Sequence, residues 1–336
     1  MAFVGRGTIL TLPSANAILI ITEKFDPHAD RVIDLFRSRG TPFFRLNTDD
    51  FHADNVVNAA SDDCIIHFRD RWGRSHRFPE ETAAVWYRKP VDPAPPSAFK
   101  DEAARKIVLQ ETLEFLSYPG CMGDARWINN PQDNLRAQRK FPQLRMAQQM
   151  GLAVPRTLIT NDPDRARAFQ GQIGGALTCK SMKAQAFEQG EKTSFIFSRR
   201  VEAKEFDQYA GEVAHCPTLL QEYVAKDHEL RVTIFGEKTF CCRIDSQSVE
   251  SGETDWRRVD PFKLPHAIIE LDPMIEAALK RMLAAYHLRF GAFDLIVTPT
   301  GETVFLELNP NGQWLWIELI TGAPMAEAMF DLLVSR

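Results

Sequence analysis

The first 125 residues combine short apolar runs with amphipathic stretches. Residues 18–22 (Ile-Leu-Ile-Ile-Thr) and 42–47 (Pro-Phe-Phe-Arg-Leu-Asn) have the length and composition of strands. Between them, residues 30–39 space apolar side chains at helical intervals and stop at Gly40, which predicts a helix. This strand–helix–strand order implies a parallel strand pair joined by a crossover helix. Two further strands and a long helix are expected at 65–69, 84–87 and 97–118.

The middle of the chain repeats this mixture of elements. Residues 127–131 are expected to form a loop that leads into a helix over 134–150, with Gly151 as its stop. The polar run 181–193 is expected to be a loop. Two strands and the capped helix between them are expected at 155–160, 176–180 and 162–170.

The last third contains the clearest β pattern. Residues 229–235 and 238–244 predict a hairpin around Gly236-Glu237, and 293–297 and 304–309 predict two more strands joined by a turn at 299–302. The remaining expected elements are a strand at 218–224 and helices at 272–287 and 316–334. The whole pattern indicates an α/β protein.

Length and composition narrow the class of protein. A chain of 336 residues is too long for one compact core and predicts two or three subdomains. A net charge of −5 provides no electrostatic argument for binding nucleic acid or an anionic membrane. The apolar run at 17–22 is too short to span a bilayer. The six cysteines include no Cys-x-x-Cys pair, so we expect reduced cysteines in a cytoplasmic protein.

Three oxygen ligands fall on the last two predicted strands. Glu307 and Asn309 are two residues apart, so their side chains leave one face of the strand, and hairpin pairing would bring Asp294 beside them. Two carboxylates and an amide oxygen suit Mg²⁺. The alternative is a structural strand pair with acids at its rim, although buried acids without a cation are costly.

Other polar residues could serve a nucleotide. The chain has no Gly-x-x-x-x-Gly-Lys-Ser/Thr run, so it is not a P-loop protein, and the cations for a triphosphate would be Lys140 and Lys180. Backbone groups at the strand end 221–224 could pair with an adenine edge, and Asp227 or Glu229 could take a ribose. Each residue alone also fits an ordinary surface position.

Two arginines could act on the transferred phosphoryl group. Arg231 and Arg243 lie on neighbouring predicted strands and could converge there, since fixed cations stabilise charge that grows in a transition state. An exposed strand face with ion pairs is the alternative for both.

The order of these residues resembles the ATP-grasp ligase fold. Within that fold, the segments 18–22, 86–90, 244–247, 255–257 and 309–314 resemble the microviridin-type peptide macrocyclases, the maturases of graspetides. The resemblance extends over nearly the whole chain from residue 17. It implies an N-terminal α/β domain, a central domain and a C-terminal domain, here 1–125, 126–217 and 218–336, with ATP between two antiparallel sheets.

The resemblance also implies a role for each candidate residue. Lys140 and Lys180 match the nucleotide lysines, and the segment 181–193 matches a flap over the phosphates. Phosphate-side arginines are matched by Arg231 and Arg243. The adenine hinge is matched by Gln221, Glu222, Tyr223 and Val224, followed by the ribose carboxylates Asp227 and Glu229. The Mg²⁺ ligands are matched by Asp294, Glu307 and Asn309.

The implied partner is a ribosomal precursor peptide. Members of the family bind a leader helix near a hairpin, which on this chain would be the segment 250–265 with Asp255-Trp256-Arg257. The implied chemistry activates a peptide Asp or Glu as an acyl phosphate, and Thr, Ser or Lys then closes an ester or amide ring. Family members often form dimers, so a homodimer is an expected state. The alternatives are an intermolecular amino-acid ligase and a peptide-binding module without turnover.

Overall fold

The structure is a computed structural model that describes residues 17–122, 125–183, 186–189, 192–195, 198–248 and 259–335. The chain divides into two compact units, each described by itself below. Unit 1 comprises residues 1–128 and 330–336, and unit 2 comprises residues 129–329. Among the described residues, no helix is both long and apolar enough to cross a bilayer.

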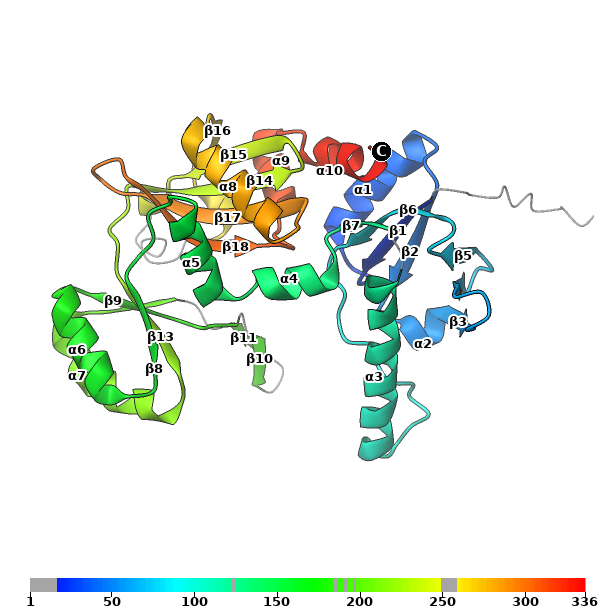
Figure 1. The fold of residues 1–336 in the computed structure, drawn as a ribbon, viewed down its shortest axis with the longest axis horizontal. Coiled ribbons are helices and arrows are strands. Elements are labelled where there is room, and N and C mark those ends of the chain that lie inside the picture. The colour runs from blue at the N-terminus through cyan, green and yellow to red at the C-terminus, as the bar shows by residue number, and fades with distance from the viewer. Residues whose placement is uncertain are drawn as a thin grey trace, which may run out of the picture. The chain divides into compact units, whose positions relative to one another are not determined.

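Unit 1 is built on a parallel sheet, as the strand–helix–strand pattern predicted. Its described strands follow the order β2-β1-β6-β7 and pair in parallel throughout (Figure 1). The loop expected at 127–131 begins inside a strand, because Arg126–Ile128 pair with β6. The elements of this sheet are β1 (Ala17–Thr22), α1 (Pro27–Ser38), β2 (Phe43–Asn47), β6 (Thr82–Tyr87) and β7 (Arg126–Ile128).

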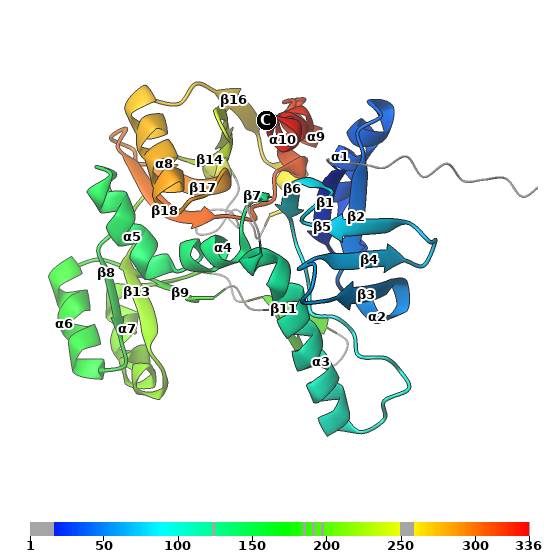
Figure 2. The same ribbon diagram turned by 45° about the vertical axis from the view of Figure 1, so that its right-hand side comes forward.

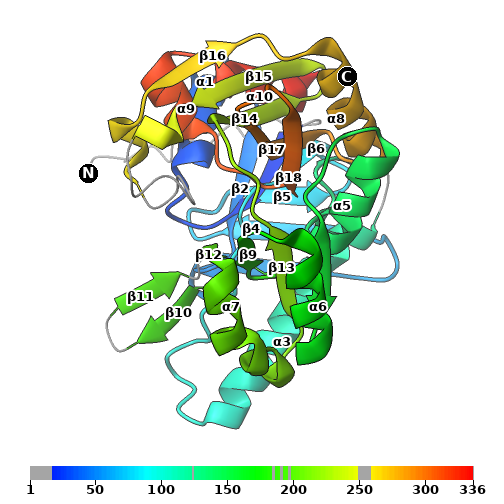
Figure 3. The same cartoon turned by 90° about the vertical axis from the view of Figure 1, so that its left-hand side faces the viewer.

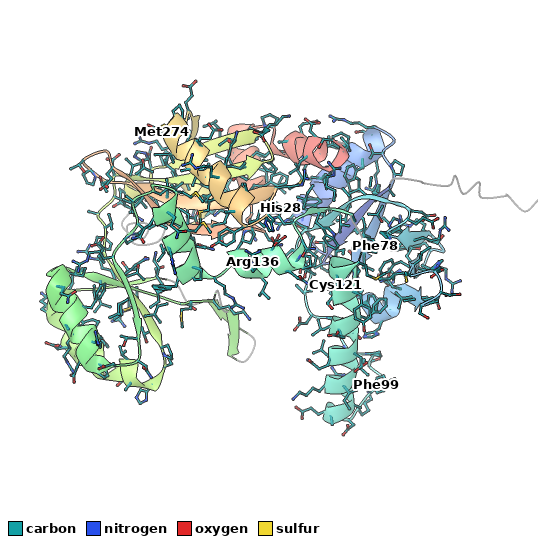
Figure 4. All side chains as sticks on the ribbon, viewed as in Figure 1. His28, Phe78, Phe99, Cys121, Arg136 and Met274 are labelled. Atoms are coloured by element: carbon teal, nitrogen blue, oxygen red, sulfur yellow. The ribbon has the colours of Figure 1, made fainter. Side chains whose placement is uncertain are left out.

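A small antiparallel sheet and a long helix complete unit 1. The described strands of this sheet follow the order β3-β4-β5, and Figure 2 shows them stacked beside α3. The helix expected from residue 97 begins later, because Asp101 caps it by accepting from the Ala104 N–H. Side chains project outward along α3, with Phe99 just ahead of it (Figure 4). The elements are α2 (Phe51–Asp54), β3 (Asn55–Ala59), β4 (Ile66–Asp70), β5 (Ser75–Phe78) and α3 (Glu102–Ser117).

The smaller sheet of unit 2 is antiparallel, and two helices pack against it. Its described strands follow the order β12-β9-β13-β8, and α6 and α7 bury their apolar sides on it (Figure 3). The prediction that residues 181–193 form a loop is wrong, since Ala186–Gln189 (β10) and Lys192–Phe195 (β11) pair as a hairpin. The other elements are β8 (Thr157–Thr160), α6 (Pro163–Ile173), β9 (Leu177–Lys180), β12 (Arg199–Val201), α7 (Ala203–Ala210) and β13 (Thr218–Glu222).

The larger sheet of unit 2 is also antiparallel. Its described strands follow the order β16-β15-β14-β17-β18. One face is apolar, and α5 and α8 cover it to form a large buried cluster. The other face carries the charged residues discussed below. The elements are α5 (Lys140–Gln149), β14 (His228–Phe235), β15 (Lys238–Ile244), β16 (His266–Ile269), α8 (Pro273–Ala285), β17 (Phe290–Val297) and β18 (Thr303–Asn309).

Two predicted helices are each divided in the structure. The helix expected over 134–150 is α4 (Pro131–Ala137) followed by α5, because Arg139 takes an extended backbone conformation. Pro142, in the first turn of α5, is the signal for this break that the prediction did not use, because proline is tolerated in the first turn of a helix but not in its interior. The helix expected over 316–334 is α9 (Leu315–Thr321) and α10 (Met325–Val334). Here Gly322, with φ of 73°, ends the first helix, and Pro324 precedes the second.

Candidate functional site

The three predicted oxygen ligands meet on one face of the large sheet. Strands β17 and β18 pair antiparallel, as predicted, with Asp294 opposite Glu307 and Ala292 opposite Asn309. The register shifts after Asp294, so that Leu295 lies opposite Phe305 and Leu306 has no partner in the ladder. Such a bulge re-aims side chains. It places Glu307 on the face of Asp294 while Phe305 stays in the core.

Each acid of this group contacts a cation. Arg231 on β14 donates from Nη1 to Asp294 Oδ1 at 2.7 Å, and both side chains are largely buried. Lys140 contacts Glu307 through Nζ and Oε2. Between the acids, the Asn309 Nδ2 donates to Asp294 Oδ2 at 3.3 Å and to Glu307 Oε1 at 3.4 Å. The three predicted ligands therefore form one cluster of polar atoms.

The donor set of this cluster fits Mg²⁺. The metal prefers hard oxygen ligands and is commonly held by one or two carboxylates plus substrate phosphates. The Asn309 amide lies between the two carboxylates. A flip of the amide, which exchanges its nitrogen and oxygen, would direct the oxygen toward the space between the carboxylates. The cluster has two carboxylates, and no group of three or more His, Cys, Asp or Glu side chains with metal-binding geometry occurs among the described residues. An all-protein cage is therefore not indicated for this part of the chain.

A cleft lies beside the cluster. The smaller sheet contributes one side and the charged face of the larger sheet the other. Several predicted residues line it together with Asp294 and Glu307, namely Lys140, Lys180, Glu229 and the segment 221–224.

The segment 221–224 is a rigid hinge at the end of β13. The N–H groups of Glu222 and Tyr223 donate to the carbonyls of Arg156 and Ala176 at 2.9 and 3.0 Å. Among the described residues, the Val224 N–H donates no hydrogen bond. The hinge therefore presents a backbone donor to the cleft at Val224, which is the type of group that an adenine edge requires.

The two predicted lysines reach the cleft from different elements. Lys140 is the first residue of α5, at the helix start and not inside a helix as expected. Lys180 is the last residue of β9, and its Cα lies opposite Leu219 of β13. The two cations and the cluster of acids border the same space, which is the charge arrangement that a Mg²⁺-bound triphosphate needs.

A buried lysine in the cleft was not predicted from the sequence. Lys226 donates from Nζ to Glu229 Oε1 at 2.6 Å, and both side chains are less than one-tenth exposed. Burial raises the pKa of Glu229 above its usual value, although Lys226 opposes this shift. By contrast, Asp227 is exposed, contacts His228, and does not belong to the described lining of the cleft. Of the two predicted ribose carboxylates, the cleft therefore contains Glu229.

The predicted convergence of Arg231 and Arg243 is wrong. In the β14–β15 register, Arg231 lies opposite Cys242 and Arg243 lies opposite Leu230. Residues paired across an antiparallel sheet have their side chains on the same face, and successive residues of one strand have them on opposite faces. Arg243 therefore shares a face with Leu230, and Arg231 is on the opposite face. Arg243 donates from Nε to Asp245 Oδ1 at 2.7 Å. Its role in the reaction stays a prediction without support from this geometry.

A second, larger cavity begins where the cleft ends. It shares Lys140, Asp294 and Glu307 with the cleft. Its further lining includes Arg231, Asn309, Asn311, Gln313 and Trp316. From the sequence, residues 310–314 were associated with a family and with no site. Asp294 and Glu307 thus lie between two spaces, the cleft and the larger second cavity.

Two predicted contact regions lie partly outside the described residues. The segment 250–265 was expected to bind a leader helix, and residues 249–258, with Asp255-Trp256-Arg257, are outside the described part of the chain. The flap segment 181–193 is described only in part, with the backbone of its hairpin but not the side chains. Both roles stay predictions.

Searches for related proteins found matches among solved structures only. No protein-family model matches the chain, and no curated protein matches it. A RiPP-associated ATP-grasp ligase of Chryseobacterium gregarium, solved with ADP and a leader and core peptide, superposes with a TM-score of 0.87. The two chains are 25% identical over 95% of this chain and 96% of the other.

Two macrocyclases of Microcystis aeruginosa are similar to a comparable degree. MdnC, solved with its precursor peptide MdnA, has a TM-score of 0.83 and 26% identity over 95% of this chain and all (100%) of its own. MdnB has a TM-score of 0.78 and 28% identity over 96% of this chain and 100% of its own. Together with the cleft between two antiparallel sheets, these likenesses identify the chain as a nucleotide-using enzyme with the ATP-grasp ligase fold, of the type found in the peptide macrocyclases.

Proposed function

We propose that this ligase closes rings in a ribosomally made precursor peptide. The observation that carries the proposal is the placement of Asp294 and Glu307 between the cleft that Lys140, Lys180 and the hinge line and the larger second cavity. A long substrate needs such a space next to the phosphate end of the nucleotide. The proposal agrees with the peptide-bound ligases that the chain resembles at 25% and 26% identity over their full lengths.

Different residues of the cleft would bind different parts of ATP. The Val224 N–H and the hinge around it would receive the adenine, and Glu229 the ribose. Lys140 and Lys180 would neutralise phosphate charge. Asp294, Glu307 and Asn309 would hold Mg²⁺, which supplies charge stabilisation to the phosphates. A relative at 20% identity, PsnB, was solved with Mg, ADP and a variant of its minimal precursor.

The reaction proceeds in two steps that need no nucleophile from the enzyme. A carboxylate oxygen of a peptide Asp or Glu attacks the γ-phosphorus of ATP, the bond to the ADP oxygen breaks, and an acyl phosphate forms. A Thr or Ser hydroxyl, or a Lys amine, then attacks the acyl carbon and phosphate leaves. Arg231, which lines the second cavity and is held by Asp294, would stabilise the charge on the transferred group. The enzyme contributes positioning and charge.

The proposal is tested with Glu307→Gln and a matched control. We expect Glu307→Gln to lower the rate of ring closure by roughly 100-fold or more, because the metal loses one of two carboxylates. Glu302→Gln, on the exposed turn of the same hairpin, should leave the rate unchanged. The measurement is intact mass and fragmentation of a candidate precursor incubated with ATP and Mg²⁺. Each ring removes the mass of one water.

The result also separates the alternatives. ADP release with a gain of peptide mass would indicate an intermolecular amino-acid ligase. Binding of peptide and nucleotide without ADP release would indicate a binding module without turnover. A Glu307→Gln enzyme that cyclises at the normal rate would contradict the metal assignment.

A further inference from the structure

A buried glutamine on α5 binds the backbone of the strand that carries the proposed metal ligands. Gln143 is 1% exposed. Its Oε1 accepts from the Leu308 N–H at 2.9 Å, and its Nε2 donates to the Leu308 carbonyl at 2.8 Å and also to the Ala137 carbonyl. Both polar atoms of the side chain are thus committed to backbone groups. Leu308 is the residue between Glu307 and Asn309.

The position of Leu308 explains why this contact matters. Strand β18 is at the edge of the sheet, so its outward N–H and C=O groups have no neighbouring strand. The Phe305 N–H is satisfied by the Ala153 carbonyl at 2.8 Å. After the bulge at Leu306, the next outward groups belong to Leu308, and the Gln143 amide pairs with them as another strand would.

Two more buried amides hold the chain just beyond the ligands. The Asn129 Nδ2 donates to the Pro310 carbonyl at 3.1 Å and to the Phe290 carbonyl at 2.9 Å. Its Oδ1 accepts from the Phe290 N–H at 3.1 Å, which ties the start of β17 to the end of β18. The Asn134 Nδ2 donates to Asn311 Oδ1 at 3.1 Å. Residues 129–143 therefore hold the backbone at Leu308 and Pro310 and the side chain of Asn311.

We propose that Gln143 is a positioning residue for the metal site: its pairing with Leu308 fixes the bulged register that aims Glu307 and Asn309 at one point. This inference rests on the proposed function, because it assumes that those two residues bind Mg²⁺. Lys140 lies one turn before Gln143 on the same helix and contacts Glu307. Helix α5 thereby holds the backbone next to Glu307 and also provides the cation that pairs with the Glu307 carboxylate.

Only an amide satisfies this contact completely. Leu308 offers one donor and one acceptor, and the Ala137 carbonyl needs a second donor. A glutamate would face two carbonyl oxygens with acceptors alone, and a methionine of similar length would form none of the bonds. Outer groups that orient metal ligands typically change metal affinity by about 10- to 100-fold when they are replaced.

The test compares Gln143→Met with Gln148→Met, an exposed glutamine on the same helix. Binding of Mn²⁺ in the presence of ADP is measured by electron paramagnetic resonance, and ADP binding without metal is measured in EDTA. We expect Gln143→Met to weaken Mn²⁺ binding by about 10-fold or more while metal-free ADP binding stays as in the wild type. Gln148→Met should match the wild type in both.

Two results would overturn the positioning role. One is unchanged Mn²⁺ affinity in a folded Gln143→Met protein, and the other is an equal loss of metal-dependent and metal-free ADP binding, which indicates general damage. If Gln143→Met does not fold, Gln143→Glu keeps the acceptor for the Leu308 N–H and is held to the same criteria. Wild-type protein that binds Mn²⁺ no better with ADP than without it would contradict the proposed metal site itself.

Discussion

Buried charges in unit 2 gather at the site. Glu229, Arg231 and Asp294 are each less than one-tenth exposed and lie on the neighbouring strands β14 and β17. Burying a charge is costly unless it is paired, and each of these has an opposite charge within hydrogen-bonding distance, Lys226 for Glu229 and Arg231 with Asp294. Replacing such pairs with apolar residues often stabilises a protein. Their concentration around the cleft therefore favours a functional reason for them.

At the residue scale, an experiment can decide which of the two predicted acids contacts the ribose. A hydrogen bond to a charged group contributes about 1.5–3 kcal/mol, so wild-type protein should prefer ATP over 2′,3′-dideoxy-ATP by roughly 10- to 100-fold. We expect Glu229→Gln to reduce that preference, because Glu229 lines the cleft. Competition binding with both nucleotides measures it.

Asp227→Asn provides the matched control, since this exposed acid lies outside the described lining of the cleft. It should keep the wild-type preference. The reverse pattern, with the preference lost in Asp227→Asn and kept in Glu229→Gln, would assign the ribose to Asp227.

At the scale of elements, the site depends on the loop that leaves β18. Gly312 lies against β17, and a Cβ on it would be 2.3 Å from the Ala292 Cβ and 2.8 Å from Arg231 Nη2. The Arg231 Nη2 also donates to the Gln313 carbonyl at 3.1 Å. The loop thus packs close to the sheet and helps to hold the arginine that borders both the metal ligands and the second cavity.

Gly312→Ala should therefore harm both stability and catalysis. We expect a loss of about 1–3 kcal/mol in the free energy of unfolding, because a Cβ would overlap the backbone-fixed Ala292. Ring closure should slow as Arg231 is displaced. Urea unfolding and the mass assay measure the two effects.

Gly171→Ala is the control for the added methyl group. Gly171 lies in α6, and no atom is within 4 Å of the position that a Cβ would take, so alanine there should be neutral or stabilise the helix by about 0.5–1 kcal/mol. If both alanine variants behave alike, the close approach of the loop is not a constraint.

At the scale of the whole molecule, unit 1 contains its own titrating group. His76 is 1% exposed, its Nε2 lies 2.8 Å from Thr82 Oγ1, and its ring stacks on Phe44. Burial lowers the pKa of His76 to about 4, although Glu81 at 4.0 Å opposes the shift. The neutral ring is therefore the form that the folded unit accepts.

The sign of the resulting pH dependence follows from linkage. The folded pKa is about 4 and the unfolded value is 6.5, so the unfolded chain binds the proton first as the pH falls. The contribution of neutral His76 to the free energy of unfolding of unit 1 should be fully present above about pH 6.5. It should decrease as the pH falls toward about pH 4, by up to about 3 kcal/mol. Urea unfolding at several pH values measures this loss, and His76→Gln should show a smaller one. An equal loss in both proteins would exclude His76 as the cause.

Much of the fold follows from local patterns, and the exceptions have specific causes. The parallel opening of unit 1, the β14–β15 hairpin and the β17–β18 hairpin were predicted because each depends on residues close in sequence. The division of the last helix had a signal, Gly322 with Pro324, that the apolar pattern concealed. The break between α4 and α5 also had a signal, Pro142, since a continuous helix through residues 134–150 would place this proline in a helix interior.

By itself, the sequence determined that Glu307 and Asn309 share a face, since the twofold period of a strand requires it. The bulge at Leu306, which the spacing of residues did not predict, decided that Asp294 lies on the same face. Only the tertiary structure decided what surrounds them. Lys140 and Gln143 reach the ligand strand from 167 and 165 residues away in sequence, and the opposite faces of Arg231 and Arg243 depend on strand register. Contacts between distant segments depend on how elements pack, and local spacing carries no information about that packing.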